Sequence, residues 1–177
     1  MFVLDPISFN RYPLKEAVST VLSARIRLGH TIYHSHRDLN RGLRGGKISV
    51  SQYVRALAFS YPGLAPRTFF RCYKIYEKLV IQCGLWPEWI EEVDFTILSK
   101  VAEAKIQIPY VRRQVIYWVL AKMRKEENYA LISRGVDRIL ANLRKNPGKI
   151  PAALQAYDKR LVDVGMEFGL TDVSADE

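Results

Sequence analysis

Long apolar runs and cysteines are scarce in this sequence, and both shortages restrict the class of protein. No run of 18 or more apolar residues occurs among the 177 residues, so we expect no membrane-spanning helix. The start, MFVLDPISFN, lacks the basic and long apolar regions of a signal peptide, and we expect a cytoplasmic protein. Two cysteines supply neither a disulfide framework nor a CxxC metal knuckle, so Cys72 and Cys83 are expected to be packed thiols.

Sequence patterns that carry catalysis are also missing. There is no Gly-x-Ser-x-Gly nucleophile elbow. The carboxylates gather in one short segment and in the tail, whereas a metal-dependent nuclease needs them in a basic cleft. The glycine-rich stretch 41–47 is not a Walker A loop, because Lys47 is followed by Ile48. We therefore predict a protein that is not an enzyme and that uses no cofactor.

The three histidines lie close together, at positions 30, 34 and 36. His30 and His34 are one helical turn apart, a spacing that lets two imidazoles share a metal, but no neighbouring cysteine or glutamate completes a site. We predict no metal and favour polar or phosphate contacts. His34 and Arg37 also spell a box that resembles the H-x-x-R box of tyrosine recombinases. The arginine–lysine framework that this chemistry needs is not recognisable around it, so recombinase activity is not predicted.

Positive charge is what the sequence has in excess. It contains 27 Lys and Arg against 18 Asp and Glu, a net charge of +9. Residues 1–86 hold 13 basic and four acidic residues, and residues 100–149 hold 12 and four. Residues 87–99 and 150–177 are acidic, each with a net charge of −4. Two basic blocks divided by acidic segments indicate a footprint for a polyanion, with an evenly solvated surface as the alternative.

The segment 48–80 carries the most specific pattern. Ser49 to Gln52 fits a helix-capping box, and the Tyr-Pro-Gly sequence at 61–63 ends the first helix. Pro66 starts a second helix, because the missing N–H of proline costs nothing at a first helical position. This second helix has an apolar face of Phe69, Cys72, Tyr73, Tyr76, Leu79 and Val80 and a cationic face of Arg67, Arg71, Lys74 and Lys78. Two helices with this division around a tight turn are typical of a helix-turn-helix.

The remaining chain is also helical by pattern, and no alternating stretch is long enough for a sheet. Helices are predicted at Pro13–Gly42, either continuous or interrupted near Gly29, at Pro87, after Asp94 or Thr96, from Pro109, at Arg134–Arg144 with Ser133 as cap, and from Pro151 to Gly165 or Gly169. The segment 47–51 is a candidate short strand, and Trp86, Trp89, Ile90 and Val93 are expected to form an apolar cluster.

These elements predict an all-α fold, a compact multi-helix bundle that contains a helix-turn-helix-like unit at about 49–80. Residues 1–86 would form a basic helical region. Residues 87–170 would form a helical bundle region that packs on it, within one domain or as a second one. The acidic tail, 171–177, is expected to be disordered.

We therefore predict a non-enzymatic DNA-binding protein with a regulatory or DNA-organising role. The predicted interface places Arg67, Thr68 and Arg71 against base edges, with Lys74, Lys78, Arg41, Arg44, Lys47, Arg112 and Arg113 on phosphates or on a second contact surface. Double-stranded DNA is the expected partner, and RNA, single-stranded DNA and a homodimer stay open. The alternative is a helical protein–protein adaptor or assembly subunit with charge-patterned surfaces.

Overall fold

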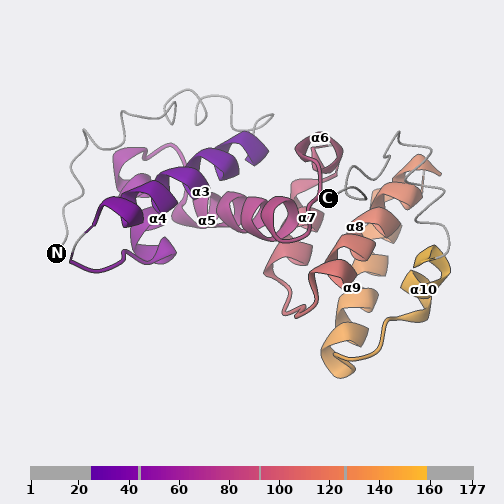
Figure 1. Cartoon of the computed structure of the whole chain (residues 1–177). Coiled ribbons are helices and arrows are strands. Elements are labelled where there is room, and N and C mark those ends of the chain that lie inside the picture. Colours follow the sequence, from indigo (N-terminus) through magenta and orange to yellow (C-terminus); the bar gives the residue numbers. More distant parts are fainter. Residues whose placement is uncertain (1–24, 44, 92, 126, 159–177) are drawn as a thin grey trace, which may run out of the picture. The chain divides into compact units, whose positions relative to one another are not determined.

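Every regular element of the described structure is a helix (Figure 1). The computed structural model describes residues 25–43, 45–91, 93–125 and 127–158. No strand occurs in these ranges, which confirms the all-α prediction for them, and none of their helices is long and apolar enough to cross a membrane. The helices are α3 (Arg25–Gly42), α4 (Val50–Ser60), α5 (Pro66–Ile75), the π-helical η1 (Tyr76–Ile81), α6 (Pro87–Ile90), α7 (Phe95–Glu103), α8 (Pro109–Arg124), α9 (Tyr129–Lys145) and α10 (Ala152–Asp158).

The chain divides into two compact units. Unit 1 ends at Glu103 and contains α3 to α7, and unit 2 begins at Ala104 and contains α8 to α10. The division predicted at residue 86 lies inside unit 1, where α7 packs against α5. Four predictions fall outside the described residues: the helix from Pro13 up to residue 24, Arg44, the last helix beyond residue 158, and the acidic tail.

Helix α5 and its continuation η1 form the centre of unit 1. Helices α3, α4 and α7 all pack against α5. The side chains of Phe69, Cys72 and Leu79, which belong to the predicted apolar face, are completely buried, and so is that of Ile75, which the prediction did not include. Burial of such a continuous apolar stripe is the main contribution to the stability of a small helical unit.

The corner between α4 and α5 follows the predicted signals. The Ser49 hydroxyl accepts from the Gln52 backbone N–H at 3.2 Å, and the Gln52 side chain accepts from the Ser49 N–H at 2.9 Å, so the capping box is confirmed. Pro66 occupies the first position of α5, as predicted. A DNA-binding helix-turn-helix is not confirmed by this corner. Only Pro66 and Arg67 of the ten residues of α5 are exposed, whereas a recognition helix presents a long face to the groove.

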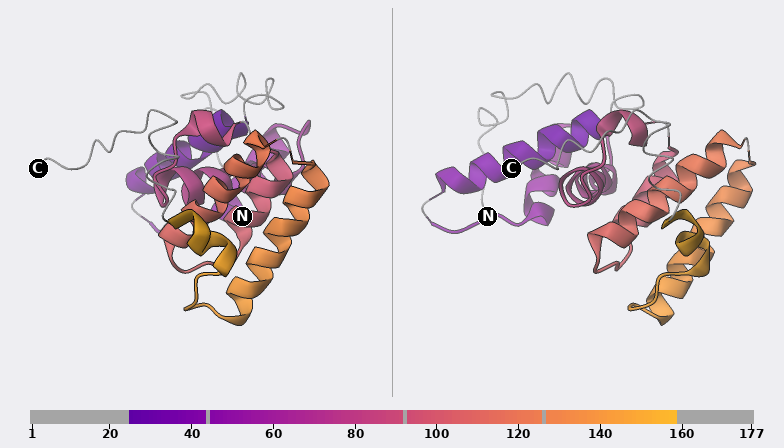
Figure 2. Two further views of the ribbon diagram at one scale, coloured as in Figure 1. Left: turned by 90° about the vertical axis from the view of Figure 1, so that its right-hand side faces the viewer. Right: turned by 45° about the vertical axis from the view of Figure 1, so that its right-hand side comes forward.

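Helix α3 packs against α5 (Figure 2), and the two backbones approach closely at Gly29. Gly29 is buried, and a Cβ atom at this position would overlap the backbone carbonyl of Cys72 and approach the Cβ of Tyr76. The helix continues through Gly29, so of the two alternatives the uninterrupted helix is the one that forms over Arg25–Gly42. Glycine is therefore required by the close approach of two backbones, even though it lowers helix propensity by about 1 kcal/mol.

Three local predictions are wrong. The segment 47–51 is not a strand, since α4 begins at Val50. Helix α9 begins at Tyr129 rather than Arg134, because the Asn128 side chain accepts from the Ala130 N–H at 2.8 Å and caps it there. Trp86 is 60% exposed and does not join the buried Ile90 and Val93 in an apolar cluster.

Unit 2 is a helical hairpin with a short third helix. Helices α8 and α9 lie side by side in both views of Figure 2, and α10 packs against α8. The Trp118 ring packs directly against Gly135 of α9, where a Cβ atom would overlap the ring. Pro109 opens α8 as predicted.

Candidate nucleic-acid interface

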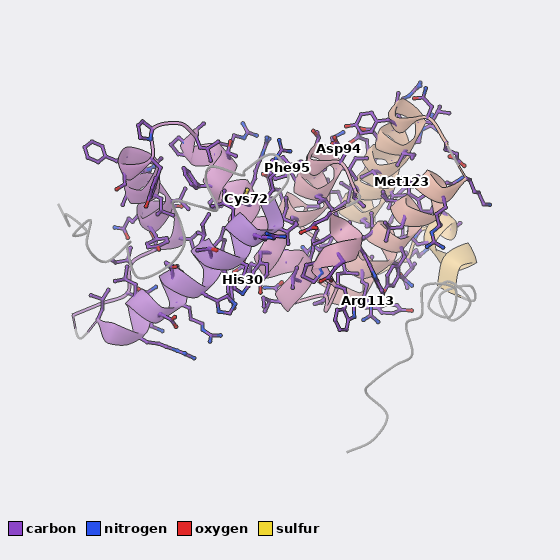
Figure 3. The ribbon with its side chains drawn as sticks, turned by 90° about the horizontal axis from the view of Figure 1, so that it is seen from above. His30, Cys72, Asp94, Phe95, Arg113 and Met123 are labelled. Atoms are coloured by element: carbon purple, nitrogen blue, oxygen red, sulfur yellow. The ribbon has the colours of Figure 1, made fainter. Side chains whose placement is uncertain are left out.

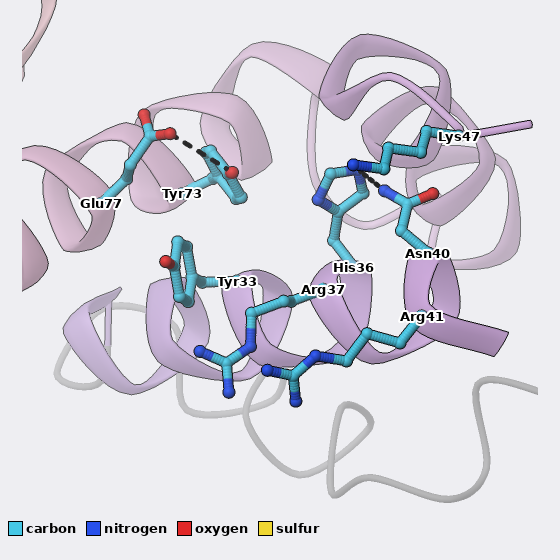
Figure 4. A pocket seen from close by; sticks show the side chains of 8 residues that line it. All are labelled: Tyr33, His36, Arg37, Asn40, Arg41, Lys47, Tyr73 and Glu77. Atoms are coloured by element: carbon cyan, nitrogen blue, oxygen red, sulfur yellow. Dashed lines mark hydrogen bonds between the residues drawn. The ribbon is translucent and has the colours of Figure 1, made fainter.

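An open hollow of about 370 Å³ lies on unit 1 (Figure 4). It is bounded by the C-terminal half of α3, by the loop that leads to α4, and by the junction of α5 with η1. Its volume is at the lower end of the range of pockets that bind small molecules. The lining combines three cations with aromatic rings, an amide and one carboxylate: Tyr33, His36, Arg37, Asn40, Arg41, Lys47, Tyr73 and Glu77.

The cations of the hollow are almost free of internal partners. Arg37 and Arg41 are one turn apart on α3, and their guanidinium groups extend in the same direction (Figure 4). Neither Arg37 nor Lys47 forms an ion pair with any residue that the structure describes. Arg41 lies 3.7 Å from Asp38 in an exposed pair, a geometry that contributes only about 0–1 kcal/mol. This side of the hollow therefore stays positive.

The loop that carries Lys47 is held against α3 by Asn40. The amide of Asn40 donates to the Ile48 carbonyl at 3.0 Å and accepts from the Ile48 N–H at 2.8 Å. His36 Nε2 lies 2.8 Å from the same carbonyl and 3.0 Å from the Asn40 amide nitrogen. Gly46 has a φ of 126°, a conformation that favours glycine. These bonds hold the loop so that Lys47 lines the hollow across from the two arginines of α3 (Figure 4).

The other side of the hollow is aromatic and ends in a carboxylate. The rings of Tyr33 and Tyr73 are 5.7 Å apart, and the Tyr73 hydroxyl faces Glu77 at 3.5 Å. Burial, together with the Glu77 charge, raises the pKa of Tyr73, so its hydroxyl stays protonated at neutral pH. The second oxygen of Glu77 accepts from Lys74 Nζ at 2.8 Å. The hollow therefore has a cationic end and an aromatic end with a hydrogen-bond acceptor.

The first turn of α5 is the second place where predicted contact residues are accessible. Arg67 is exposed there and forms no ion pair within the described ranges. Thr68 is half-buried, and its backbone N–H donates to the Ala65 carbonyl at 2.9 Å. Arg67 and Thr68 are therefore accessible to a partner, as the sequence predicts.

The other predicted cations of α5 and η1 are engaged within unit 1. Arg71 Nε lies 3.2 Å from the Glu103 carboxylate, and Lys74 and Lys78 lie 2.8 Å and 3.8 Å from Glu77. Their side chains are only 32%, 25% and 26% exposed. A DNA phosphate would have to compete with these carboxylates, so this face is less available than the sequence pattern indicates.

The predicted contact residues of unit 2 are divided between interior and surface. Arg112 is only 3% exposed and donates to the carbonyls of Ala104 and Ile106, both at 3.0 Å. The prediction that Arg112 lies on a contact surface is therefore wrong. Its guanidinium is buried and is hydrogen-bonded to the segment that precedes α8. Arg113 is half-buried, with its guanidinium 5.9 Å from the Tyr117 ring centre.

Of the three histidines of α3, His36 lines the hollow, whereas His30 and His34 pack against each other and against Tyr76. His30 and His34 have ring centres 4.4 Å apart, and His34 Nε2 lies 3.4 Å from the Tyr76 hydroxyl (Figure 3 shows His30 on α3). Burial lowers the pKa of His34, and the neighbouring His30 and Arg37 lower it further. No three His, Cys, Asp or Glu side chains come together as a metal site anywhere in the described ranges.

Sequence reasoning singled out Arg41 and Lys47, and the structure brings them together with Arg37. It missed Arg37 as a binding residue, along with Tyr33 and Glu77, because no pattern links these positions before the helices pack. The cationic half of the hollow can hold an anion, and the aromatic half can hold a flat ring. Comparisons with protein-family models, curated protein sequences and solved structures find no match.

Proposed function

We propose that the protein binds DNA through the basic face of unit 1 and has a regulatory or DNA-organising role in the cytoplasm rather than a catalytic one. The observation that carries this proposal is the gathering of Arg37, Arg41 and Lys47 around one hollow. Residues 25–60 contain seven Lys and Arg against one Asp. Such a surface displaces condensed counterions from DNA, which supplies affinity independent of base sequence.

A helix-turn-helix contribution to this function is limited to the start of α5. Arg67 and Thr68 would reach base edges, and an arginine that contacts guanine bidentately contributes about 1–3 kcal/mol of discrimination. The cations that follow are paired with Glu103 and Glu77. Phosphate contacts from the hollow are therefore the stronger part of the proposal.

The test is a salt titration of duplex binding, followed by fluorescence anisotropy. We compare Arg37→Ala/Lys47→Ala with Arg27→Ala/Arg55→Ala, which removes two other exposed cations from the same unit and changes the net charge equally. Each phosphate contact contributes about −0.9 to the slope of log K against log salt. We expect the hollow variant to lose about two contacts, a slope change of about 1.8, and the control variant to keep the wild-type slope.

Two outcomes would contradict the proposal. Equal losses in both double variants would mean that binding follows net charge and not the hollow. Absence of duplex binding by the wild-type protein at about 0.15 M salt would exclude DNA as the partner at working ionic strength.

A helical adaptor is the second candidate, and exposed aromatic side chains favour it. Phe59 is 90% exposed at the end of α4, and Trp86 is 60% exposed before α6. Large aromatic residues are enriched at protein–protein interfaces. If the protein self-associates in sedimentation equilibrium, Phe59→Ser should shift it towards the monomer, whereas DNA binding through the hollow should be unchanged.

A further inference from the structure

We infer that the hollow of unit 1 is a pocket for one unpaired nucleotide of a nucleic-acid strand. The inference rests on the proposed function and specifies which part of the strand the site holds. A surface that only follows the backbone of a duplex needs cations and no cavity. Here the cations open onto a hollow of about 370 Å³ whose lining also contains aromatic rings and a carboxylate.

The two ends of the hollow match the two ends of a nucleotide. Arg37 and Arg41 extend side by side and can share one phosphate, and Lys47 lies across the hollow from them (Figure 4). Tyr33 is half-buried, and its ring is held by the rings of Tyr73 at 5.7 Å and Tyr76 at 5.6 Å. A ring fixed by packing next to a phosphate site is the arrangement on which single-stranded bases stack.

Glu77 explains why the nucleotide should be unpaired. One of its oxygens is taken by Lys74, and the other has only a long 3.5 Å contact with the Tyr73 hydroxyl. That oxygen can accept a hydrogen bond from an amino or imino N–H of a base. In a duplex the pairing edges are occupied and the ring faces are stacked, so a base enters such a pocket only from a single-stranded end or after leaving the helix.

The experiment measures binding of one duplex in three forms at about 0.15 M salt. The forms are blunt, with a three-nucleotide unpaired tail, and with the same tail lacking its bases; tails are placed at either the 5′ or the 3′ end. Base–aromatic stacking changes affinity by about tenfold per base. We expect the base-bearing tail to raise affinity about tenfold over the blunt duplex, and the abasic tail to raise it far less.

Protein variants identify the pocket in the same assay. Tyr33→Leu should abolish the preference for the base-bearing tail, whereas Tyr33→Phe should keep it, since the Tyr33 hydroxyl has no hydrogen bond within the described structure. Glu77→Gln should reduce the preference at least threefold. Circular dichroism and urea unfolding show that each variant is folded.

The outcomes separate this inference from the proposed function. Equal binding of blunt and tailed duplexes, or of base-bearing and abasic tails, overturns the nucleotide pocket and leaves DNA binding standing. Binding of the tailed form alone supports the pocket and contradicts the duplex interface. A tail preference that survives Tyr33→Leu places the nucleotide elsewhere and overturns the assignment, and no binding of any form overturns both.

Discussion

Replacing Gly29 by alanine should destabilise unit 1, although alanine is the better helix former. The added Cβ atom would overlap the Cys72 carbonyl and lie 3.0 Å from the Tyr76 Cβ. The Cys72 carbonyl belongs to the α5 backbone and cannot rotate away, so α3 and α5 must separate. Overpacking of this kind costs about 1–3 kcal/mol, and a backbone clash belongs at the upper end. The helix-propensity gain of about 1 kcal/mol offsets part of it, which leaves a net loss of about 2 kcal/mol.

Urea unfolding followed by circular dichroism measures this difference. Gly42→Ala is the matched control, because it makes the same change in the same helix and its Cβ atom meets nothing within 4 Å. We expect the urea midpoint of Gly29→Ala to be lower than that of the wild-type protein, and the midpoint of Gly42→Ala not to be lowered. The Gly29 variant should also bind DNA more weakly, since the hollow spans the two helices that are forced apart. A midpoint for Gly29→Ala equal to that of the control would refute the close crossing of α3 and α5.

Three further predictions concern the surroundings of the hollow. Asn40→Ala should lower the free energy of unfolding by about 1–3 kcal/mol, because it leaves the Ile48 N–H without its partner and removes the Asn40 amide from the Ile48 carbonyl, which keeps only its contact with His36. It should also weaken DNA binding as Lys47→Ala does; urea unfolding and anisotropy measure the two effects. Burial raises the pKa of the Cys72 thiol to about 12, and Cys83 is buried too, so a thiol reagent at pH 8 should label neither cysteine in the native protein and both in urea. Because burial lowers the pKa of His34, the unfolded state takes up its proton first as pH falls below 6.5. Stability should therefore decrease from pH 6.5 downwards until the native histidine titrates, and His34→Gln should flatten urea midpoints measured across this range; an equal slope in the variant would assign the effect to other groups.

Local signals in the sequence determined most of the helices. Three signals act within a few residues along the chain: the capping box at Ser49, the proline at the start of α5, and the apolar stripe from Phe69 to Leu79. The helices that they specify can therefore be predicted without knowledge of the tertiary structure. Gly84, which follows the end of η1, has a φ of 66°, a backbone conformation that favours glycine for an equally local reason. The excess of positive charge before residue 86 is likewise a property of composition.

Tertiary packing alone decided which cations are available for binding. Arg71 meets a carboxylate 32 positions away, at Glu103, and this pairing depends on α7 packing against α5. The clamp from Asn40 to Ile48 and the close approach at Gly29 are equally invisible to periodicity, because they join positions that become neighbours only after the helices pack. Helical periodicity assigns a side chain to a face, but the charge that the face presents depends on the opposite charges that folding brings to it.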